Sequence, residues 1–193
     1  MKLVFATHNP NKFREVQILM PKHVKLLSLN DIGCLEDIPE TSDTIEGNAI
    51  LKAEHVKSHY GYDCFADDTG LEVSALNGAP GVYSARYANT SNNAQANMEK
   101  LLNEMLDIED RSARFKTAIA LTLEGHQNLF LGICEGTITL EPRGKEGFGY
   151  DPIFQPLGFV ETFAEMSLTQ KSEIGHRGKA MRELLEYLSL NNS

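Results

Sequence analysis

Two adjacent carboxylates, Asp67 and Asp68, stand between short apolar stretches near the middle of the chain and are followed by Thr69 and Gly70. Burying such a pair costs free energy unless cations or hydrogen-bond donors compensate the charge. Carboxylate oxygens suit hard divalent cations, and through such a cation a phosphate can bind. A divalent-metal and phosphate site and an Asp-rich turn between two strands therefore explain the segment equally well. On a strand the two carboxylates would face opposite sides, so at most one would face a given cleft.

A polar loop with the sequence THNPNK occupies residues 7–12, between a predicted strand at 2–6 and a helix that Pro21 ends. The unpaired backbone N–H groups at the start of a helix can bind anions, so the loop is a candidate phosphate site. It lacks the glycines of a Walker loop. The alternative is that His8 and Asn9 only cap the helix.

An irregular acidic connection at 31–43 leads to a predicted helix at 44–60. Acidic loops are usually just solvated, which is the simplest interpretation of Glu40 and its neighbours. On the helix, Asn48 and Lys52 lie one turn apart beside the apolar stripe, so both could reach a cleft. A lone helical lysine is nevertheless more often a surface residue.

A second polar cluster begins with the glycine-rich segment 144–154, in which glycines flank Phe148. An aromatic ring presented on such a loop can stack against a nucleotide base. Further along the chain, Lys171 precedes His176 and Arg177 near the start of a helix. The alternative for the last two residues is helix capping and surface charge.

The chain has 193 residues and a net charge of −9, which argues against a nucleic-acid-coating surface because that would need a basic stripe. No segment resembles a targeting or membrane-spanning sequence. The three cysteines, Cys34, Cys64 and Cys134, are far apart and form no Cys-x-x-Cys pair. We therefore expect neither a disulfide framework nor a zinc site, but buried, reduced thiols in a cytoplasmic protein.

The remaining pattern predicts one compact α/β unit, with two lobes as a further option. Strands at 63–66 and 71–75 are predicted on either side of the Asp pair, followed by a helix at 91–106. Strict alternation then predicts a long strand at 113–123, and after a turn at 124–127 the segment 128–140 is predicted to return as its partner in a hairpin.

Taken together, the polar segments resemble the inosine/xanthosine triphosphate pyrophosphatase family, whose members hydrolyse non-standard purine nucleoside triphosphates. The resemblance runs nearly end to end, and seven segments in the right order and spacing are very hard to obtain by chance. These segments are 7–12, 40–41, 48–53, 67–71, 78–87, 147–154, and 171–172 together with 176–178.

The resemblance implies a single domain over residues 1–193, an elongated α/β structure with a long mixed β-sheet flanked by helices, and a central cleft between two lobes. It also implies a cytoplasmic homodimer that uses Mg²⁺ to convert ITP, dITP and XTP to the monophosphate and pyrophosphate. Such an enzyme would cleanse the nucleotide pool and prevent incorporation of these nucleotides into DNA and RNA.

Residue by residue, the resemblance implies that Asp68 is catalytic and that Glu40 and Asp68 bind magnesium. The substrate-binding residues that it implies are Thr7, His8, Asn9, Pro10, Asn11, Lys12, Thr69, Phe148, Gly149, Tyr150, Asp151, Lys171, His176 and Arg177. An arginine fork fits the O6 and N7 acceptors of hypoxanthine and xanthine, so Arg177 would disfavour adenine. Residue types alone do not decide between Asp67 and Asp68 as the general base, and the resemblance favours Asp68.

Three other functions are compatible with parts of the pattern. A related pyrophosphatase could act on another modified nucleotide, such as a pyrimidine, and would differ only in the base pocket. A nucleotide-binding regulator that no longer hydrolyses would not need the full set of charge-neutralising residues, including Lys12, Glu40, Asp67 and Asp68. A nucleic-acid-binding module fits least, because of the negative net charge.

Overall fold

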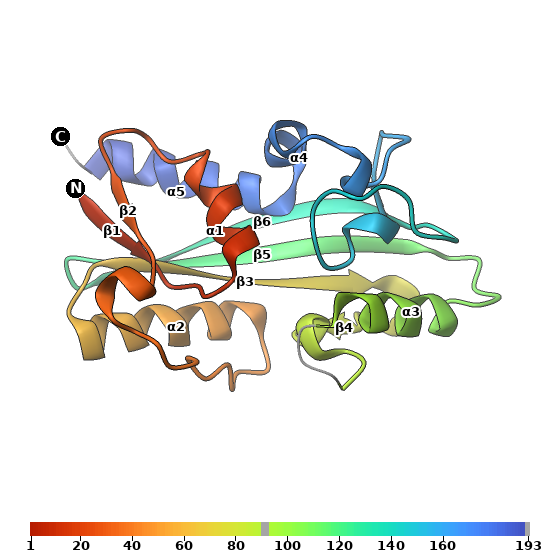
Figure 1. Ribbon diagram of the computed structural model, residues 1–193, viewed down its shortest axis with the longest axis horizontal. Coiled ribbons are helices and arrows are strands. Elements are labelled where there is room, and N and C mark those ends of the chain that lie inside the picture. The colour runs from red at the N-terminus through yellow and green to blue at the C-terminus, as the bar shows by residue number, and fades with distance from the viewer. Residues whose placement is uncertain (90–92, 192–193) are drawn as a thin grey trace. The chain divides into compact units, whose positions relative to one another are not determined.

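The computed structural model describes residues 1–89 and 93–191, which form a mixed β-sheet flanked by helices (Figure 1). The helices are α1 (Pro10–Gln17), α2 (Ile45–Tyr60), α3 (Ala94–Glu104), α4 (Leu168–Ile174) and α5 (His176–Asn191). The strands are β1 (Lys2–Phe5), β2 (Lys25–Leu27), β3 (Cys64–Val73), β4 (Pro80–Gly81), β5 (Ser112–Leu123), β6 (His126–Ile138) and β7 (Phe154–Pro156).

The strand order is β2-β1-β3-β5-β6-β7, and β4 pairs with β3. Strand β1 is parallel to both β2 and β3, whereas the β3–β4 and β6–β7 pairs are antiparallel. The predicted α/β class with a mixed, helix-flanked sheet is therefore confirmed. The single domain over 1–193, the elongated shape and the cleft between two lobes stay predictions.

The chain divides into two compact units, which we describe separately. The first unit consists of Met1–Asp68, Thr117–Gly132 and Arg177–Ser193, and the second of Thr69–Lys116 and Ile133–His176. Strands β3, β5 and β6 each supply residues to both units.

In the first unit, α1 and α5 lie on one face of the strands and α2 lies on the other (Figure 1). Successive strand residues point to opposite faces, which explains how β3 contacts both helix layers. Phe65 stacks on Phe5 at 4.7 Å and belongs to the core that α1 and α5 cover. Its neighbour Cys64 instead donates a hydrogen bond of 3.1 Å from Sγ to the carbonyl oxygen of Ala53 on α2.

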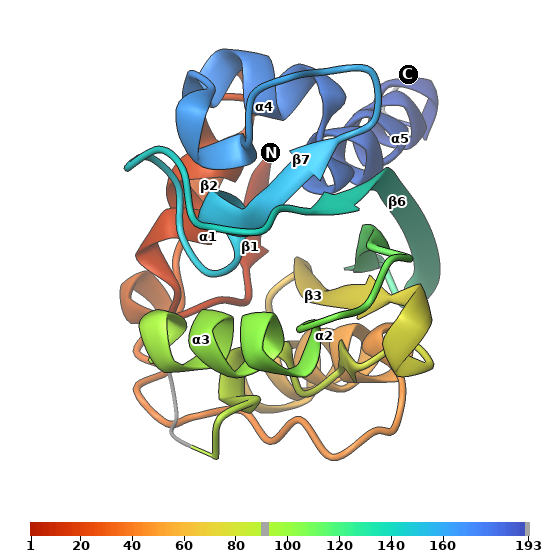
Figure 2. The same ribbon diagram turned by 90° about the vertical axis from the view of Figure 1, so that its right-hand side faces the viewer.

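In the second unit, α3 and α4 lie on opposite sides of β6 and β7 (Figure 2). Phe115, Phe154 and Phe163 form an aromatic cluster with ring centroids 4.7–5.9 Å apart, and all three rings are buried. Met98 and Leu101 of α3 belong to the same hydrophobic core. The second unit therefore has an apolar core of its own.

The prediction that two strands flank Asp67 and Asp68 was wrong, because β3 runs without interruption from Cys64 to Val73. Both carboxylates are buried within the strand, which is possible because cationic and amide groups contact them, as described below. The predicted helix at 44–60 is confirmed as α2, with Thr44 as its N-cap and Gly61 in the left-handed conformation at its end.

Other predictions are confirmed or extended. The helix predicted at 91–106 corresponds to α3, although residues 90–92 lie outside the described part of the chain. Helix α4 and the short strands β4 and β7 were not predicted. All three cysteines are buried, free thiols, as expected.

Among residues 1–89 and 93–191, no helix has both the length and the apolar character needed to cross a membrane.

Candidate active site

Asp67 lies in a buried ion cluster on the side of β3 that α1 and α5 cover. Lys12 of α1 donates from Nζ to Oδ1 of Asp67 over 3.1 Å, and Arg177 of α5 donates from Nε to Oδ2 over 2.9 Å. Arg177 also donates from Nη1 to Oε2 of Glu15. Each buried charge in this cluster therefore has an opposite charge beside it, which is the condition for burying it at all.

The pKa shifts show how strongly these charges stabilise one another. Burial alone would raise the pKa of Asp67, but the positive charges of Lys12 and Arg177 outweigh it and hold the pKa well below its usual range. Burial alone would likewise lower the pKa of Arg177, but Asp67 and Glu15 raise it. Asp67 is thus an anion at neutral pH whose charge is compensated by neighbouring residues.

Asp68 points to the other side of β3, toward α2. Its Oδ2 accepts a hydrogen bond of 3.3 Å from Nδ2 of Asn48, and its Oδ1 lies 3.6 Å from Nζ of Lys52. The same Nζ donates to Oε1 of Glu40 over 2.5 Å. The structure thus brings the two predicted metal ligands, Glu40 and Asp68, around one lysine ammonium group.

The electrostatic setting of Asp68 is the reverse of that of Asp67. Burial raises the pKa of Asp68, and the neighbouring carboxylates add to this effect, although Lys52 lowers it. The pKa of Lys52 is raised, because Asp68 and Glu40 outweigh the effect of burial. A carboxylate with a raised pKa is better suited to accept a proton near neutral pH than one with a lowered pKa.

The candidate phosphate loop leads into α1, where Asn9 is the N-cap. Asn9 Oδ1 accepts hydrogen bonds from the backbone N–H groups of Asn11, at 2.9 Å, and Lys12, at 3.2 Å, and Pro10 occupies the first turn. Thr7 Oγ1 accepts a bond of 3.1 Å from the backbone N–H of Asn9. The capping alternative is therefore confirmed for Asn9, and phosphate binding by this loop stays a prediction.

His8 does not cap the helix. Its Nε2 lies 3.0 Å from the carbonyl oxygen of Glu36, and its side chain is exposed. The predicted contact of His8 with substrate stays a prediction.

In the second unit, the glycine-rich loop folds around the carboxylate of Asp151. Oδ2 of Asp151 accepts a bond of 2.8 Å from the backbone N–H of Phe148 and a bond of 2.6 Å from Nζ of Lys171. The ammonium group of Lys171 also lies 4.8 Å from the centre of the Phe148 ring. One buried ion pair thereby holds the aromatic ring of the loop in place.

Gly147 permits this arrangement, and its substitution gives a direct test. Its φ is +74°, and a Cβ atom built there would lie 2.1 Å from Oδ2 of Asp151. We expect Gly147→Ala to lower the free energy of unfolding by more than about 1–3 kcal/mol, the usual cost of a left-handed non-glycine residue, because it also displaces the Asp151 carboxylate. Chemical denaturation of the purified variant would measure the loss.

Gly149→Ala is the matched control. Gly149 has a φ of +63°, yet a Cβ atom there would meet nothing within 4 Å. It carries the same backbone strain without the overlap. Equal losses of stability in the two variants would show that the Asp151 carboxylate does not constrain the loop.

Three further predicted residues belong to this second unit. Tyr150 is buried and donates a bond of 2.8 Å from its hydroxyl to the carbonyl oxygen of Ser84. His176 is buried and stacks on Phe115 with ring centroids 4.6 Å apart. Thr69 lies on β3 directly after Asp68. Tyr150 and His176 thus have structural contacts, and their roles toward a substrate stay predictions.

The predicted residues fall into two groups, one in each unit. In the first unit, Lys12 and Arg177 contact Asp67 on one side of β3, whereas Glu40 and Asp68 share Lys52 on the other side. In the second unit, Phe148, Asp151 and Lys171 come together. Sequence reasoning missed Glu15, the buried partner of Arg177. Its position three residues after Lys12, on the same face of α1, could have indicated it.

Comparison with known proteins places these features in context. A sequence model described as the Ham1 family matches residues 3–187. A curated protein of Christiangramia forsetii, named dITP/XTP pyrophosphatase, is 68% identical over 98% of this chain and 100% of its own length. A protein of the same name from Flavobacterium johnsoniae is 60% identical over 98% of each chain.

Solved structures agree with the sequence relatives. A HAM1 protein from Coxiella burnetii superposes with a TM-score of 0.90 at 38% identity, over 98% of each chain. A structure from Mycobacterium abscessus, described as a nucleoside-triphosphatase / dITP/XTP pyrophosphatase, superposes with a TM-score of 0.78 at 42% identity, over 96% of this chain and 99% of the other.

Proposed function

Because the chain belongs to the Ham1 family, we propose that it hydrolyses the non-standard purine nucleoside triphosphates ITP, dITP and XTP to the monophosphate and pyrophosphate. The observation that carries this proposal is the likeness, along almost the whole chain, to proteins named dITP/XTP pyrophosphatase. Such an activity removes these nucleotides before they enter DNA or RNA.

The reaction is an in-line displacement by water at the α-phosphorus. The bond from the α-phosphorus to the bridging oxygen breaks, and pyrophosphate leaves with that oxygen. The protein must therefore neutralise the charge that develops on the phosphate oxygens, and it must position one water molecule and accept its proton.

Glu40 and Asp68 are proposed to hold Mg²⁺. One lysine ammonium group already contacts both carboxylates, at 2.5 Å and 3.6 Å, so the pair can share a cation. Both donors are carboxylate oxygens, which magnesium prefers. When bound, the metal would supply positive charge to the phosphate oxygens of the substrate.

Asp68 is proposed to orient and deprotonate the attacking water. Burial raises its pKa, whereas Asp67 on the opposite face has a lowered pKa and is neutralised by Lys12 and Arg177. This difference supports the assignment to Asp68. We propose that Asp67 instead acts structurally, by holding Lys12 at the start of α1.

The substrate is proposed to bind with its triphosphate at residues 7–12. Within the second unit, Phe148 is proposed to stack against a purine base, on a ring face that Lys171 and Asp151 hold in place. Arg177 is proposed to favour bases with acceptors at O6 and N7. In this structure its Nε donates to Asp67 and its Nη1 donates to Glu15. Loss of Arg177 would therefore also change stability, and base selection must be measured on a variant that is shown to be folded.

We further propose that the protein acts as a homodimer in the cytoplasm. The dimer rests on the family resemblance, and the location rests also on the expectation of reduced thiols. The negative net charge argues against nucleic acid as a partner. Sedimentation of the purified protein would measure the oligomeric state.

The test of the reaction is turnover of ITP, XTP, dITP, GTP, ATP and UTP with Mg²⁺ in ¹⁸O-labelled water. We expect monophosphate and pyrophosphate from ITP, dITP and XTP, little product from ATP, and label in the monophosphate. Removal of the metal with EDTA should abolish turnover, and added Mg²⁺ should restore it.

Each contrary outcome has a definite meaning. Release of orthophosphate would show that attack is not at the α-phosphorus. Preference for a pyrimidine triphosphate would identify a related pyrophosphatase with a different base pocket. Binding of ITP without turnover would indicate a nucleotide-binding regulator.

A further inference from the structure

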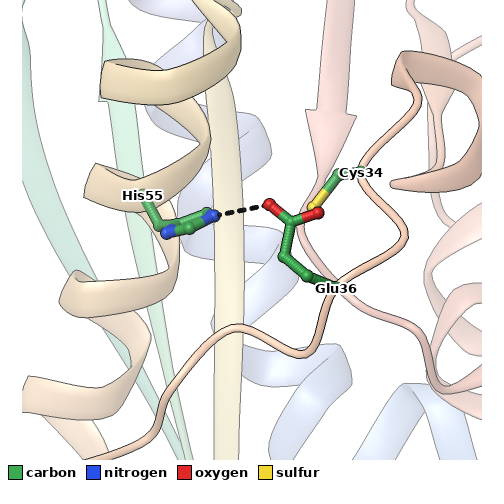
Figure 3. Close-up of side chains that lie close together, drawn as sticks. All are labelled: Cys34, Glu36 and His55. Atoms are coloured by element: carbon green, nitrogen blue, oxygen red, sulfur yellow. Dashed lines mark hydrogen bonds and ion pairs between the residues drawn. The ribbon is translucent and has the colours of Figure 1, made fainter.

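Three side chains of different ligand types meet beside α2, and none of them is assigned to the proposed reaction: Cys34, Glu36 and His55 (Figure 3). A carboxylate oxygen of Glu36, Sγ of Cys34 and a ring nitrogen of His55 all lie within 4.8 Å of one another. Two of them come from the acidic connection and one from α2. We propose that these three residues form a zinc-binding site, with water as the fourth ligand.

The geometry is close to that of a zinc site. Bonds of about 2.0–2.3 Å in a tetrahedron place neighbouring ligand atoms about 3.3–3.8 Å apart. Nε2 of His55 already lies 3.2 Å from Oε1 of Glu36. Since the sulfur lies within 4.8 Å of both atoms, it needs a movement of at most about 1 Å, which a change in side-chain torsion can supply.

The ligand types distinguish this site from a magnesium site. Thiolate and imidazole suit zinc, whereas magnesium prefers oxygen ligands and near-octahedral geometry. Burial raises the pKa of the Cys34 thiol, so the sulfur would release its proton to solvent as zinc binds. Glu36 needs no such step, because a hydrogen bond from Tyr60 lowers the pKa of its carboxyl to about 2.

Surrounding groups orient two of the three ligands. The hydroxyl of Tyr60 lies 2.7 Å from Oε1 and 2.9 Å from Oε2 of Glu36. The ring of His59 stacks on that of His55 with centroids 4.2 Å apart. Such outer contacts fix the orientation of metal ligands and raise metal affinity. The exposed side chain of Glu36 leaves a route for the ion from solvent.

A metal here would tie the acidic connection to α2. Glu36 lies four residues before Glu40 on that connection, and His55 lies three residues after Lys52 on α2. The Glu40–Lys52 ion pair and the contacts of Glu36 with His55 and Tyr60 already join the same two elements. Zinc would reinforce these links, and because it would bind the folded chain we expect it to raise the Tm of the protein.

Titration of the full chain with Co²⁺ and Zn²⁺, in excess Mg²⁺, tests the site. Cobalt is expected to produce a thiolate-to-metal charge-transfer band, which oxygen ligands at the proposed magnesium site cannot produce. Zinc is expected to abolish this band at one equivalent. Cys34→Ser should remove the band, and His55→Ala should weaken zinc binding by more than about 100-fold, since even outer contacts contribute about 10–100-fold.

Two variants serve as matched controls. His59→Ala removes a neighbouring histidine that is not one of the three ligands, and Cys134→Ala removes a buried thiol of the second unit. Both should keep the cobalt band. Tyr60→Phe should retain the band but weaken zinc binding, because it removes only the hydroxyl that orients Glu36.

The proposal is overturned if saturating cobalt gives no thiolate band, or if the band persists in Cys34→Ser. Unchanged zinc affinity in His55→Ala would also overturn it. Circular dichroism verifies that each variant is folded. Should Cys34→Ser not fold, His55→Ala and Glu36→Gln carry the test, because both side chains lie at least partly in solvent.

Discussion

We expect Asp68→Asn to lower kcat for ITP by about 10²–10⁴-fold while the protein stays folded. Asparagine has nearly the same shape as aspartate but neither accepts a proton at neutral pH nor carries the charge that attracts a metal. Lys52 retains Glu40 as a partner in this variant, so the local charge balance is only partly lost. Steady-state hydrolysis of ITP over a range of Mg²⁺ concentrations would measure the effect.

The range of metal concentrations separates the two roles proposed for Asp68. If Asp68 acted only as a metal ligand, excess Mg²⁺ would restore much of the rate. If it also accepts the proton of water, the loss should persist at saturating metal. A kcat close to that of the wild type in excess Mg²⁺ would show that Asp68 is not the general base, and a wild-type kcat at every Mg²⁺ concentration would show that it has neither role.

Asp43→Asn is a suitable charge-matched control, because Asp43 is an exposed carboxylate shortly before α2. It should leave kcat unchanged. Asp67→Asn provides a second comparison. Since Asp67 faces Lys12 and Arg177, we expect its replacement to reduce stability more than Asp68→Asn does and to affect the chemical step less.

Arg177→Ala should lower the free energy of unfolding by about 3–5 kcal/mol. Arg177 is buried, with 3% of its surface exposed, and it pairs with both Asp67 and Glu15. Removal of Arg177 breaks its ion pair with Glu15, whereas Asp67 keeps its ion pair with Lys12. Urea denaturation followed by circular dichroism would measure the change.

Two further variants test the cause of this loss. Arg14→Ala removes an exposed arginine from α1 and should change stability by no more than about 0.5 kcal/mol. Adding Glu15→Gln to Arg177→Ala should recover part of the loss, because it removes the charge of a carboxylate that has lost its ion pair with Arg177. A stability of Arg177→Ala within about 0.5 kcal/mol of the wild type would mean that other groups compensate these charges.

Base selection can be judged only once stability is known. In a folded Arg177 variant, a narrower gap between the kcat/KM values for ITP and ATP would support contact of the guanidinium with the base. An unchanged ratio would assign Arg177 to the ion cluster alone.

Much of the secondary structure could be predicted from local patterns. Apolar residues at helical spacing, with Thr44 before them and Gly61 after them, predicted α2 almost to its ends. Strict alternation predicted β5, and the turn after it predicted β6 as the returning strand of a hairpin. These elements follow from neighbours in the sequence, since side-chain periodicity and capping are local properties.

The local pattern failed where distant residues decide the outcome. The two adjacent aspartates were explained equally well by a turn between two strands and by a metal and phosphate site. In the structure, β3 continues through them without a turn. Lys12 and Arg177 make this possible, and Arg177 is 110 residues away from Asp67 in the chain. Their charges reduce the cost of burying the carboxylate, and no feature near Asp67 reveals that they are there.

The same distinction applies to the candidate zinc ligands. The absence of a Cys-x-x-Cys pair led to the expectation that no zinc site exists. The three ligands proposed here come from the acidic connection and from α2, and folding brings them together.

The residue types of the proposed catalytic site can be read from the sequence, and the two-residue period of a strand implies that Asp67 and Asp68 face opposite sides if they lie on one strand. Which carboxylate is neutralised depends on the folded chain. Helices α1 and α5 bring Lys12 and Arg177 to Asp67, whereas α2 brings Asn48 and Lys52 to Asp68. The pKa of each carboxyl depends on burial and on charges within a few ångströms, and those charges come from segments far apart in the chain.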